Sequence, residues 1–292
     1  MVLATTMTVA CGRDTVRSPA SATASPTAAQ TQRIEVDAQT RSYRLYRPSE
    51  VEAEPALVVM LHGGGGTALQ AERTYGWNAL ADREGFLVVY PEGRHRAWNS
   101  GGGCCGRAAR DDVDDVGFLQ AVVDELVSSE GVDASRIYVT GMSNGAMMSY
   151  ALACSTDILA AIAPVAGTML ADCADPTPVS VLHIHGTADT SVRMDGGLGS
   201  GPAQIAGPPI SSVVARWRAV DRCTPPTTTT VGAVHHEIAS CTDGLEVGLI
   251  TVDGAGHQWP GAEQARGSAD PPADQLDATE TIWRFFAANP RP

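Results

Sequence analysis

Short apolar runs recur along most of this chain, separated by stretches in which apolar residues return with a helical period. The runs carry Val, Ile and Leu in succession rather than at every second position, so they predict strands buried on both faces of a sheet. They span residues 56–61, 86–90, 137–140, 160–165, 179–184 and 247–252. The helical stretches span residues 69–83, 114–127, 146–153, 211–222 and 276–286. This order predicts an α/β fold with a mostly parallel central sheet and helices on both faces.

Two segments depart from the alternation of strands and helices. Residues 34–36 and 43–46 predict an antiparallel hairpin that leads into the sheet. The short segment between Cys223 and Cys241 predicts a β-excursion.

The N-terminal region differs in composition from the rest. Residues 1–11 are weakly apolar and end in Cys11, which follows an apolar pair, as at the end of a bacterial lipoprotein signal. The segment lacks the positive charge that ordinarily precedes the apolar part of a signal, so plain secretion stays open. Residues 12–32 are rich in Ser, Thr, Ala and Pro and predict a disordered tether. Residues 33–292 are then expected to form a single domain.

Composition excludes several classes of function. The chain carries 33 acidic and 20 basic side chains, a net charge of −13, which argues against nucleic acid and anionic membrane surfaces as partners. It contains no lysine, so a P-loop, a Schiff-base enzyme and a Ser–Lys hydrolase are excluded. No apolar run reaches the ~18 residues of a membrane helix. We expect an exported monomer without a cofactor, attached to a membrane only if Cys11 is lipidated.

The cysteines indicate an oxidising compartment. Six remain when Cys11 is set aside, an even number, and six cysteines allow about fifteen connectivities. The pair that we favour is Cys223 with Cys241, which flank the β-excursion. Cys154 could reach Cys173, leaving the neighbours Cys104 and Cys105 as a vicinal bridge, or these four could exchange partners.

A G-x-S-x-G motif carries the first candidate chemistry. It occupies residues 141–145, directly after the predicted strand 137–140 and before the predicted helix 146–153. A strand-to-helix turn of this kind strains the central serine and exposes its hydroxyl above a sheet. We predict that Ser143 is a nucleophile; an ordinary turn is the alternative.

A serine nucleophile needs a base, and the base needs an orienting acid. In folds that use this turn, the acid and then the histidine follow the serine along the chain. Asp189 and His257 lie in loops just past predicted strands, where open α/β sheets place their sites. We therefore predict a triad of Ser143, Asp189 and His257. Asp253 is the alternative acid, although its position four residues before His257 suits it poorly.

Two histidine clusters invite a metal interpretation. His183 and His185 lie near Asp189, and His235 and His236 adjoin a glutamate. Neither cluster completes a zinc signature, so we expect no metal, and His183 is expected to be a satisfied core residue.

The developing oxyanion of acyl transfer needs donors. The glycine-rich loop after strand 56–61 supplies one backbone N–H in this type of fold, and the residue after the nucleophile supplies the other. We predict Gly64 and Asn144, with Gly65 as the alternative to Gly64.

Five motifs together resemble one family: H-G-G at 62–64, D-D-V-G-F at 114–118, G-M-S-N-G at 141–145, H-G-T-A-D at 185–189 and G-H-Q-W-P-G at 256–261. The set is similar to the extracellular polyhydroxybutyrate depolymerase and feruloyl-esterase family of α/β-hydrolases, over about residues 33–287. The resemblance implies a secreted serine esterase with its triad at Ser143, Asp189 and His257. Hydroxyalkanoate oligomers are the favoured substrates, and feruloylated or acetylated polysaccharides are the alternative. A peptidase and a non-catalytic polymer- or carbohydrate-binding module are the rival classes.

Two tryptophans and one acidic pair complete the candidates. Trp98 and Trp259 are predicted to line the substrate pocket, since flat rings bury much apolar area; packing of the loops is the alternative. Asp114 and Asp115 could be a carboxylate pair for glycoside cleavage, but they begin a predicted helix, where acidic residues interact favourably with the dipole.

Overall fold

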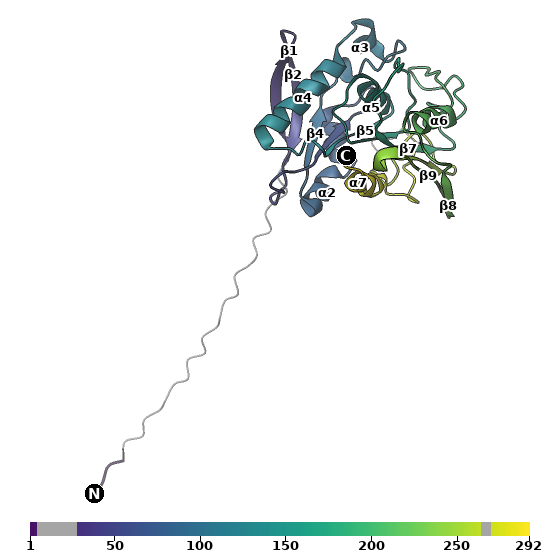
Figure 1. The fold of residues 1–292 in the computed structure, drawn as a ribbon. Helices are drawn as coiled ribbons and strands as arrows, with labels where there is room; N and C mark the ends of the chain where they lie inside the picture. Colours follow the sequence, from purple (N-terminus) through teal and green to yellow (C-terminus); the bar gives the residue numbers. More distant parts are fainter. Residues whose placement is uncertain (5–27, 264–269) are drawn as a thin grey trace.

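The computed structural model describes residues 1–4, 28–263 and 270–292 (Figure 1). Its strands form one sheet in the order β1-β2-β4-β3-β5-β6-β7-β10-β9-β8. Neighbouring strands pair in parallel from β4 to β10 and antiparallel at both edges. The strands are β1 (Gln30–Val36), β2 (Gln39–Tyr46), β3 (Leu57–Leu61), β4 (Leu87–Pro91), β5 (Ile137–Met142), β6 (Ala161–Val165), β7 (Ser180–Gly186), β8 (Thr227–Val231), β9 (Val234–Ser240) and β10 (Glu246–Val252). The predicted mostly parallel sheet is confirmed.

Helices cover both faces of the sheet, as predicted. They are α1 (Ala68–Thr74), α2 (Trp77–Glu84), α3 (Gly106–Arg110), α4 (Asp115–Glu130), α5 (Asn144–Ser155), α6 (Ile210–Val220) and α7 (Ala278–Ala288), with short 3-10 turns η1 (Arg94–Arg96) and η2 (Thr242–Gly244). Side chains of α4, α5 and α6 share one core, and those of α1, α2 and α7 share another. Within the described ranges, no helix has both the length and the apolar character needed to cross a bilayer.

Strand β3 explains why the sequence shows unbroken apolar runs. Leu57, Val59 and Leu61 belong to the core under α4, α5 and α6, whereas Val58 and Met60 belong to the core under α1, α2 and α7. Because successive side chains point to opposite faces, a strand covered on both sides needs an apolar residue at every position.

Two predicted boundaries were wrong. The helix expected over 69–83 is divided into α1 and α2, because Gly76 has φ 75°, a left-handed conformation that a continuous helix does not contain. The sheet begins at Gln30, so residues 30–32 belong to β1 and not to the expected tether. Cys11 and the rest of residues 5–27 lie outside the described residues, so the signal segment and its lipidation stay predictions.

Three disulfides join the six remaining cysteines. Cys223 and Cys241 are bonded at the base of the β8–β9 hairpin, the pairing that we favoured. Cys154 is bonded to Cys173, and Cys104 to its neighbour Cys105. Cross-links of this kind restrict the unfolded chain and persist in oxidising compartments.

A buried ion pair joins the first hairpin to the start of α4. The Arg41 guanidinium lies 2.7 Å from the Asp115 carboxylate and 3.8 Å from the centre of the Phe118 ring. The second Asp115 oxygen accepts the Asn99 N–H at 2.8 Å. Asp114 accepts the Gly117 N–H at 2.8 Å and begins the helix, so the helix-cap interpretation of the acidic pair holds for Asp114, while Asp115 is an internal anchor.

Replacing Arg41 by alanine should lower the free energy of unfolding by about 3–5 kcal/mol, because the Asp115 carboxylate would be left buried without its counter-charge. Urea denaturation measures the loss. Arg33→Ala is the control, since Arg33 is exposed on β1, and it should change stability by no more than about 0.5 kcal/mol. Similar small losses in both variants would show that the buried pair does not have this role.

Candidate active site

Ser143 lies at the turn between β5 and α5, above the carboxyl end of the parallel strands. Its backbone has φ 56° and ψ −115°, a region that residues other than glycine rarely adopt. The turn is held by the Ser143 N–H, which donates to the Val165 carbonyl at 2.9 Å, and by the Ser143 carbonyl, which accepts from the Met147 N–H at 3.0 Å. Strain that is maintained by the surrounding structure is common at functional sites.

The glycines of the motif are required by close packing. A Cβ on Gly145 would lie 2.4 Å from the Leu61 carbonyl oxygen, and one on Gly141 would lie 2.5 Å from the Gly145 carbonyl carbon. Any larger residue at either position would push α5 away from the end of β3. The spacing of the motif therefore sets the distance between the turn and the glycine-rich loop.

Asp189 and His257 follow β7 and β10, which are neighbours in the sheet. Their loops are tied together, since the Ala188 N–H donates to the Ala255 carbonyl at 2.9 Å. The His257 N–H in turn donates to the Asp270 carboxylate at 2.7 Å. Asp189 and His257, which are far apart in the sequence, thus meet at the carboxyl ends of the parallel strands.

The three predicted triad residues form a chain of hydrogen bonds. His257 Nε2 lies 2.8 Å from Ser143 Oγ, and His257 Nδ1 lies 2.7 Å from Asp189 Oδ2. Asp189 is 5% exposed, and its other oxygen accepts the N–H groups of Ser191 and Val192, both at 2.8 Å. These hydrogen bonds hold the Asp189 carboxylate against the His257 imidazole. Ser143 lies between His257 and the cleft.

A buried row of side chains supports Asp189 from behind. His185 Nε2 donates to the Val192 carbonyl at 2.8 Å, so His185 Nδ1 must accept from His183 Nε2 at 2.9 Å when the ring is neutral. His183 Nδ1 then accepts from the Tyr150 hydroxyl at 2.8 Å. Burial lowers the pKa of both histidines, which keeps them neutral.

The structure supports neither a metal site at the histidine clusters nor Asp253 as the acid of the triad. Among the described residues, no group of three side chains converges as a metal site would require. Asp253 is bonded to His235 at 2.8 Å and does not contact His257, so it does not replace Asp189.

Two backbone N–H groups border Ser143 where an oxyanion would form. Cβ of Asn144 lies 3.7 Å from the position that a Cβ on Gly64 would take, so the two residues are adjacent. Gly65 N–H already donates to the Arg96 carbonyl at 2.7 Å. The N–H of Gly65 is thus already used, which favours the pair Gly64 and Asn144.

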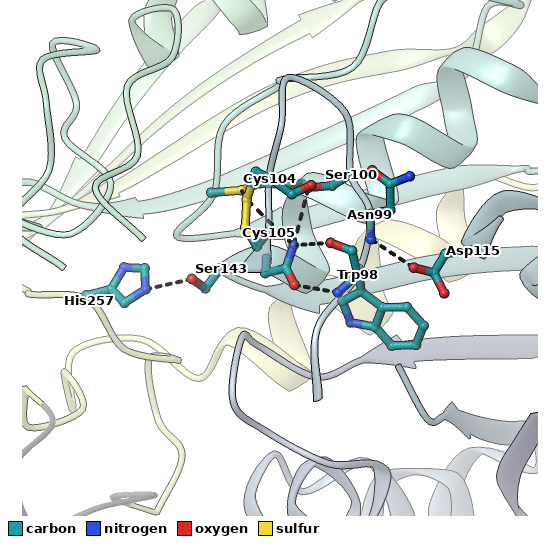
Figure 2. Close-up of a disulfide and its surroundings, with 10 residues drawn as sticks. Trp98, Asn99, Ser100, Cys104, Cys105, Asp115, Ser143 and His257 are labelled. Atoms are coloured by element: carbon teal, nitrogen blue, oxygen red, sulfur yellow. Dashed lines mark hydrogen bonds between the residues drawn. A yellow bond between two sulfur atoms is a disulfide. The ribbon is translucent and has the colours of Figure 1, made fainter. Parts of the chain in front are cut away.

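The Asn144 side chain holds the loop that carries the vicinal disulfide. Its Oδ1 accepts from the Trp98 N–H at 2.7 Å, and its Nδ2 donates to the Trp98 carbonyl at 3.1 Å and to Ser100 Oγ at 3.2 Å (Figure 2). The Cys104–Cys105 bridge lies beside the same amide (Figure 2). Asn144 therefore has a second role that the motif alone did not indicate.

The substrate-lining role predicted for both tryptophans was wrong. Trp98 is fully buried, and its indole N–H donates to the His62 carbonyl at 2.8 Å. Trp259 is 1% exposed, and its indole N–H donates to Thr279 Oγ1 at 3.0 Å. Both rings pack the loops around the site, the alternative stated above. Tyr75, which contacts Trp259, lines the cleft instead.

Two lobes of one cleft meet at Ser143 and His257. The first lobe, of about 370 Å³, is bordered by Gln70, Tyr75, Gln258 and Asp270. The second lobe, of about 520 Å³, has an apolar floor with Cys105, Met147, Val192 and Ile205. A substrate can therefore place one part on each side of the serine.

His62 is a site residue that the sequence did not reveal. Its Nε2 accepts the Gly93 N–H at 3.0 Å, and its Nδ1 donates to the Gly63 carbonyl at 2.9 Å. Burial lowers the pKa of His62 to about 4. The neutral ring thus fixes the start of the glycine-rich loop. The H-G-G motif at 62–64 included this histidine but did not indicate its role.

A family model described as esterase PHB depolymerase matches residues 41–200, more than half of the chain. The chain belongs to this family. It is a carboxylic ester hydrolase with the α/β-hydrolase fold, as the resemblance implied.

Two relatives in sequence agree with this assignment. The esterase is 35% identical to NocK of Nocardia uniformis subsp. tsuyamanensis, a protein provisionally named as an esterase, over 78% of this chain and 73% of that one. It is 32% identical to feruloyl esterase B of Piromyces equi over 69% of this chain and 39% of that one. The chain therefore spans well under half of the feruloyl esterase.

A solved structure shows the same fold. The acetyl xylan esterase from Aspergillus awamori superposes with a TM-score of 0.64 at 18% identity, covering 89% of this chain and 99% of that one. At this identity the likeness concerns the fold alone.

His62 should make the esterase less stable in mild acid. The unfolded chain takes up a proton at a pKa near 6.5, whereas folded His62 does so only near 4, so its stabilising contribution is complete above pH 6.5 and is lost as the pH falls toward 4. Between pH 7.5 and pH 5, the wild type should lose about 2 kcal/mol more than His62→Gln. Urea denaturation at the two pH values measures the difference. Equal losses in both proteins would contradict this role of His62.

Proposed function

We propose that this esterase cleaves carboxylic esters through an acyl-enzyme on Ser143. The observation that carries the proposal is the unbroken path from Ser143 Oγ to His257 Nε2 and from His257 Nδ1 to Asp189, with both distances below 3 Å. Ser143 and His257 line the cleft, beside the backbone of Gly64 and Asn144. A base, its orienting acid and oxyanion donors are the parts that acyl transfer needs.

In the acylation step, His257 Nε2 takes the Ser143 proton as Oγ attacks the ester carbonyl carbon. The carbonyl oxygen becomes an oxyanion, which the N–H groups of Gly64 and Asn144 stabilise. His257 then gives the proton to the alcohol oxygen as the ester bond breaks. Asp189 orients the imidazole and stabilises its charged form.

In the second step, water replaces the alcohol. His257 takes a proton from the water, the hydroxide attacks the acyl carbon, and the ester bond to Ser143 breaks. The proton held by His257 returns to Ser143 Oγ, and the carboxylic acid leaves. Two lobes around one serine suit this sequence, because the acyl group can stay in one lobe while the alcohol leaves the other.

We infer that the substrates are hydroxyalkanoate oligomers or related esters. The matched family bears the name of polyhydroxybutyrate depolymerases, and a cleft that continues on both sides of Ser143 can hold consecutive units of an oligomer. Feruloyl and acetyl xylan esters are the second candidate, and the name of the relative from Piromyces equi favours the feruloyl esters. Rates on hydroxybutyrate oligomers, methyl ferulate and acetylated xylan would distinguish them.

The disulfides support a place of action outside the cytoplasm. We propose secretion or attachment to the outer face of the cell membrane through Cys11. Incorporation of labelled palmitate into the wild type but not into Cys11→Ser would support attachment, and its absence would favour plain secretion.

Replacing Ser143 by alanine should lower kcat on p-nitrophenyl butyrate by at least about 10⁴-fold, because the nucleophile is removed. Ser155→Ala is the matched control: Ser155 is exposed at the last position of α5, and its loss should leave kcat within about twofold. Circular dichroism checks that both variants are folded. Comparable turnover by Ser143→Ala would contradict the mechanism.

The rival classes have separate outcomes. A binding module predicts that the wild type turns over no ester, and a peptidase predicts cleavage of peptide substrates by the same serine. Ester turnover without peptide cleavage would exclude both.

A further inference from the structure

The two lobes of the cleft carry opposite charge. Asp270 borders the first lobe, where His257 is the only basic side chain among the described residues. His95, Arg96 and Arg107 border the second lobe, and no acidic side chain of the described chain does. In a chain with net charge −13, such a local reversal creates a positive field directly beside Ser143.

Arg96 differs from the other two cations of the second lobe, because it forms no salt bridge with a described residue. Asp111 lies 3.3 Å from His95 and 3.0 Å from Arg107 and offsets both. Arg96 is exposed. Burial raises the pKa of the half-buried Glu92, and the charge of Arg96 partly offsets this rise. The Arg96 Nε donates to the Gly66 carbonyl at 3.3 Å. Its own carbonyl accepts the Gly65 N–H at 2.7 Å, so the residue is joined to the loop that carries Gly64.

The backbone bends at the residue that carries this guanidinium. His95 and Arg96 have φ 55° and 60°, a left-handed bend that turns the chain at the mouth of the lobe. The Nε contact uses one donor and leaves the terminal nitrogens of the fork for a ligand. A planar fork of this kind matches a carboxylate, which it can hold by two parallel hydrogen bonds.

We propose that the second lobe binds a carboxylate of the substrate and that Arg96 determines this preference. The occupant is an ester with an apolar segment, which lies on the floor formed by Met147, Val192 and Ile205, and with a carboxylate at its far end. A hydroxyalkanoate oligomer with a free acid terminus has this chemistry. The inference rests on the proposed esterase function.

Two pairs of small esters test the proposal. In the first pair, 3-butyryloxybutyrate carries the carboxylate on its alcohol part, and 3-butyryloxybutyramide is its neutral counterpart. In the second pair, monoethyl succinate carries the carboxylate on its acyl part, and ethyl succinamate is neutral. Titration of the released acid gives kcat/KM for each ester, and the ratio of charged to neutral ester within a pair is the measured quantity.

In at least one pair, this ratio should exceed one for the wild type and fall about fivefold to tenfold in Arg96→Gln. Arg96→Lys should keep most of the preference, because it keeps the charge. Arg33→Gln, which removes an exposed arginine from the edge strand β1, should keep all of it. The pair that responds shows whether the carboxylate belongs to the acyl or the alcohol part.

Salt provides a second readout that needs no variant. Raising sodium chloride from 20 mM to 500 mM should lower the wild-type ratio toward one, because exposed charges are screened. A wild-type ratio near one in both pairs, or an equal ratio in Arg96→Gln, would overturn the proposal. If only the neutral esters are turned over, the carboxylate proposal fails and the proposed esterase function stands. If no ester is turned over, the proposed esterase function itself is contradicted.

Discussion

The structure depends on the close approach of the β5–α5 turn to the end of β3. Gly145 permits it, because its Cα lies where any side chain would collide with the carbonyl oxygens of Leu61 and His62. This approach places Ser143 in its strained conformation and brings the N–H of Asn144 beside that of Gly64. The positions of the proposed nucleophile and oxyanion donors thus follow from one packing contact, and the loops after β7 and β10 add the proposed acid and base.

The fold and the triad positions could be predicted because they follow local patterns. Unbroken apolar runs indicate strands covered on both faces, and the parallel order places the ends of those strands at one edge. Ser143, Asp189 and His257 each follow such a strand directly, so the sequence indicated which side of the sheet they share. The antiparallel hairpins were predicted less completely, because their strands are not covered on both faces: residues 34–36 and 43–46 were expected, whereas the strands span Gln30–Val36 and Gln39–Tyr46.

Features that depend on side-chain direction could not be predicted. Trp98 and Trp259 lie close to site residues in the sequence, but their rings turn into the loops because each indole N–H finds a buried oxygen there. His62 and Arg96 are held in place by hydrogen bonds between segments that are distant in the chain. The break before α2 at Gly76 required a backbone conformation that the helical period of apolar residues does not report.

The central claim is that Ser143 is the nucleophile and that His257 activates it. Inactivation with diisopropyl fluorophosphate, followed by mapping of the modified peptide, tests it most directly. The account predicts one modified residue per chain, Ser143, with esterase activity lost in proportion to its modification and with much slower labelling of His257→Ala. Loss of activity with the label on another residue, or full activity with Ser143 modified, would contradict it.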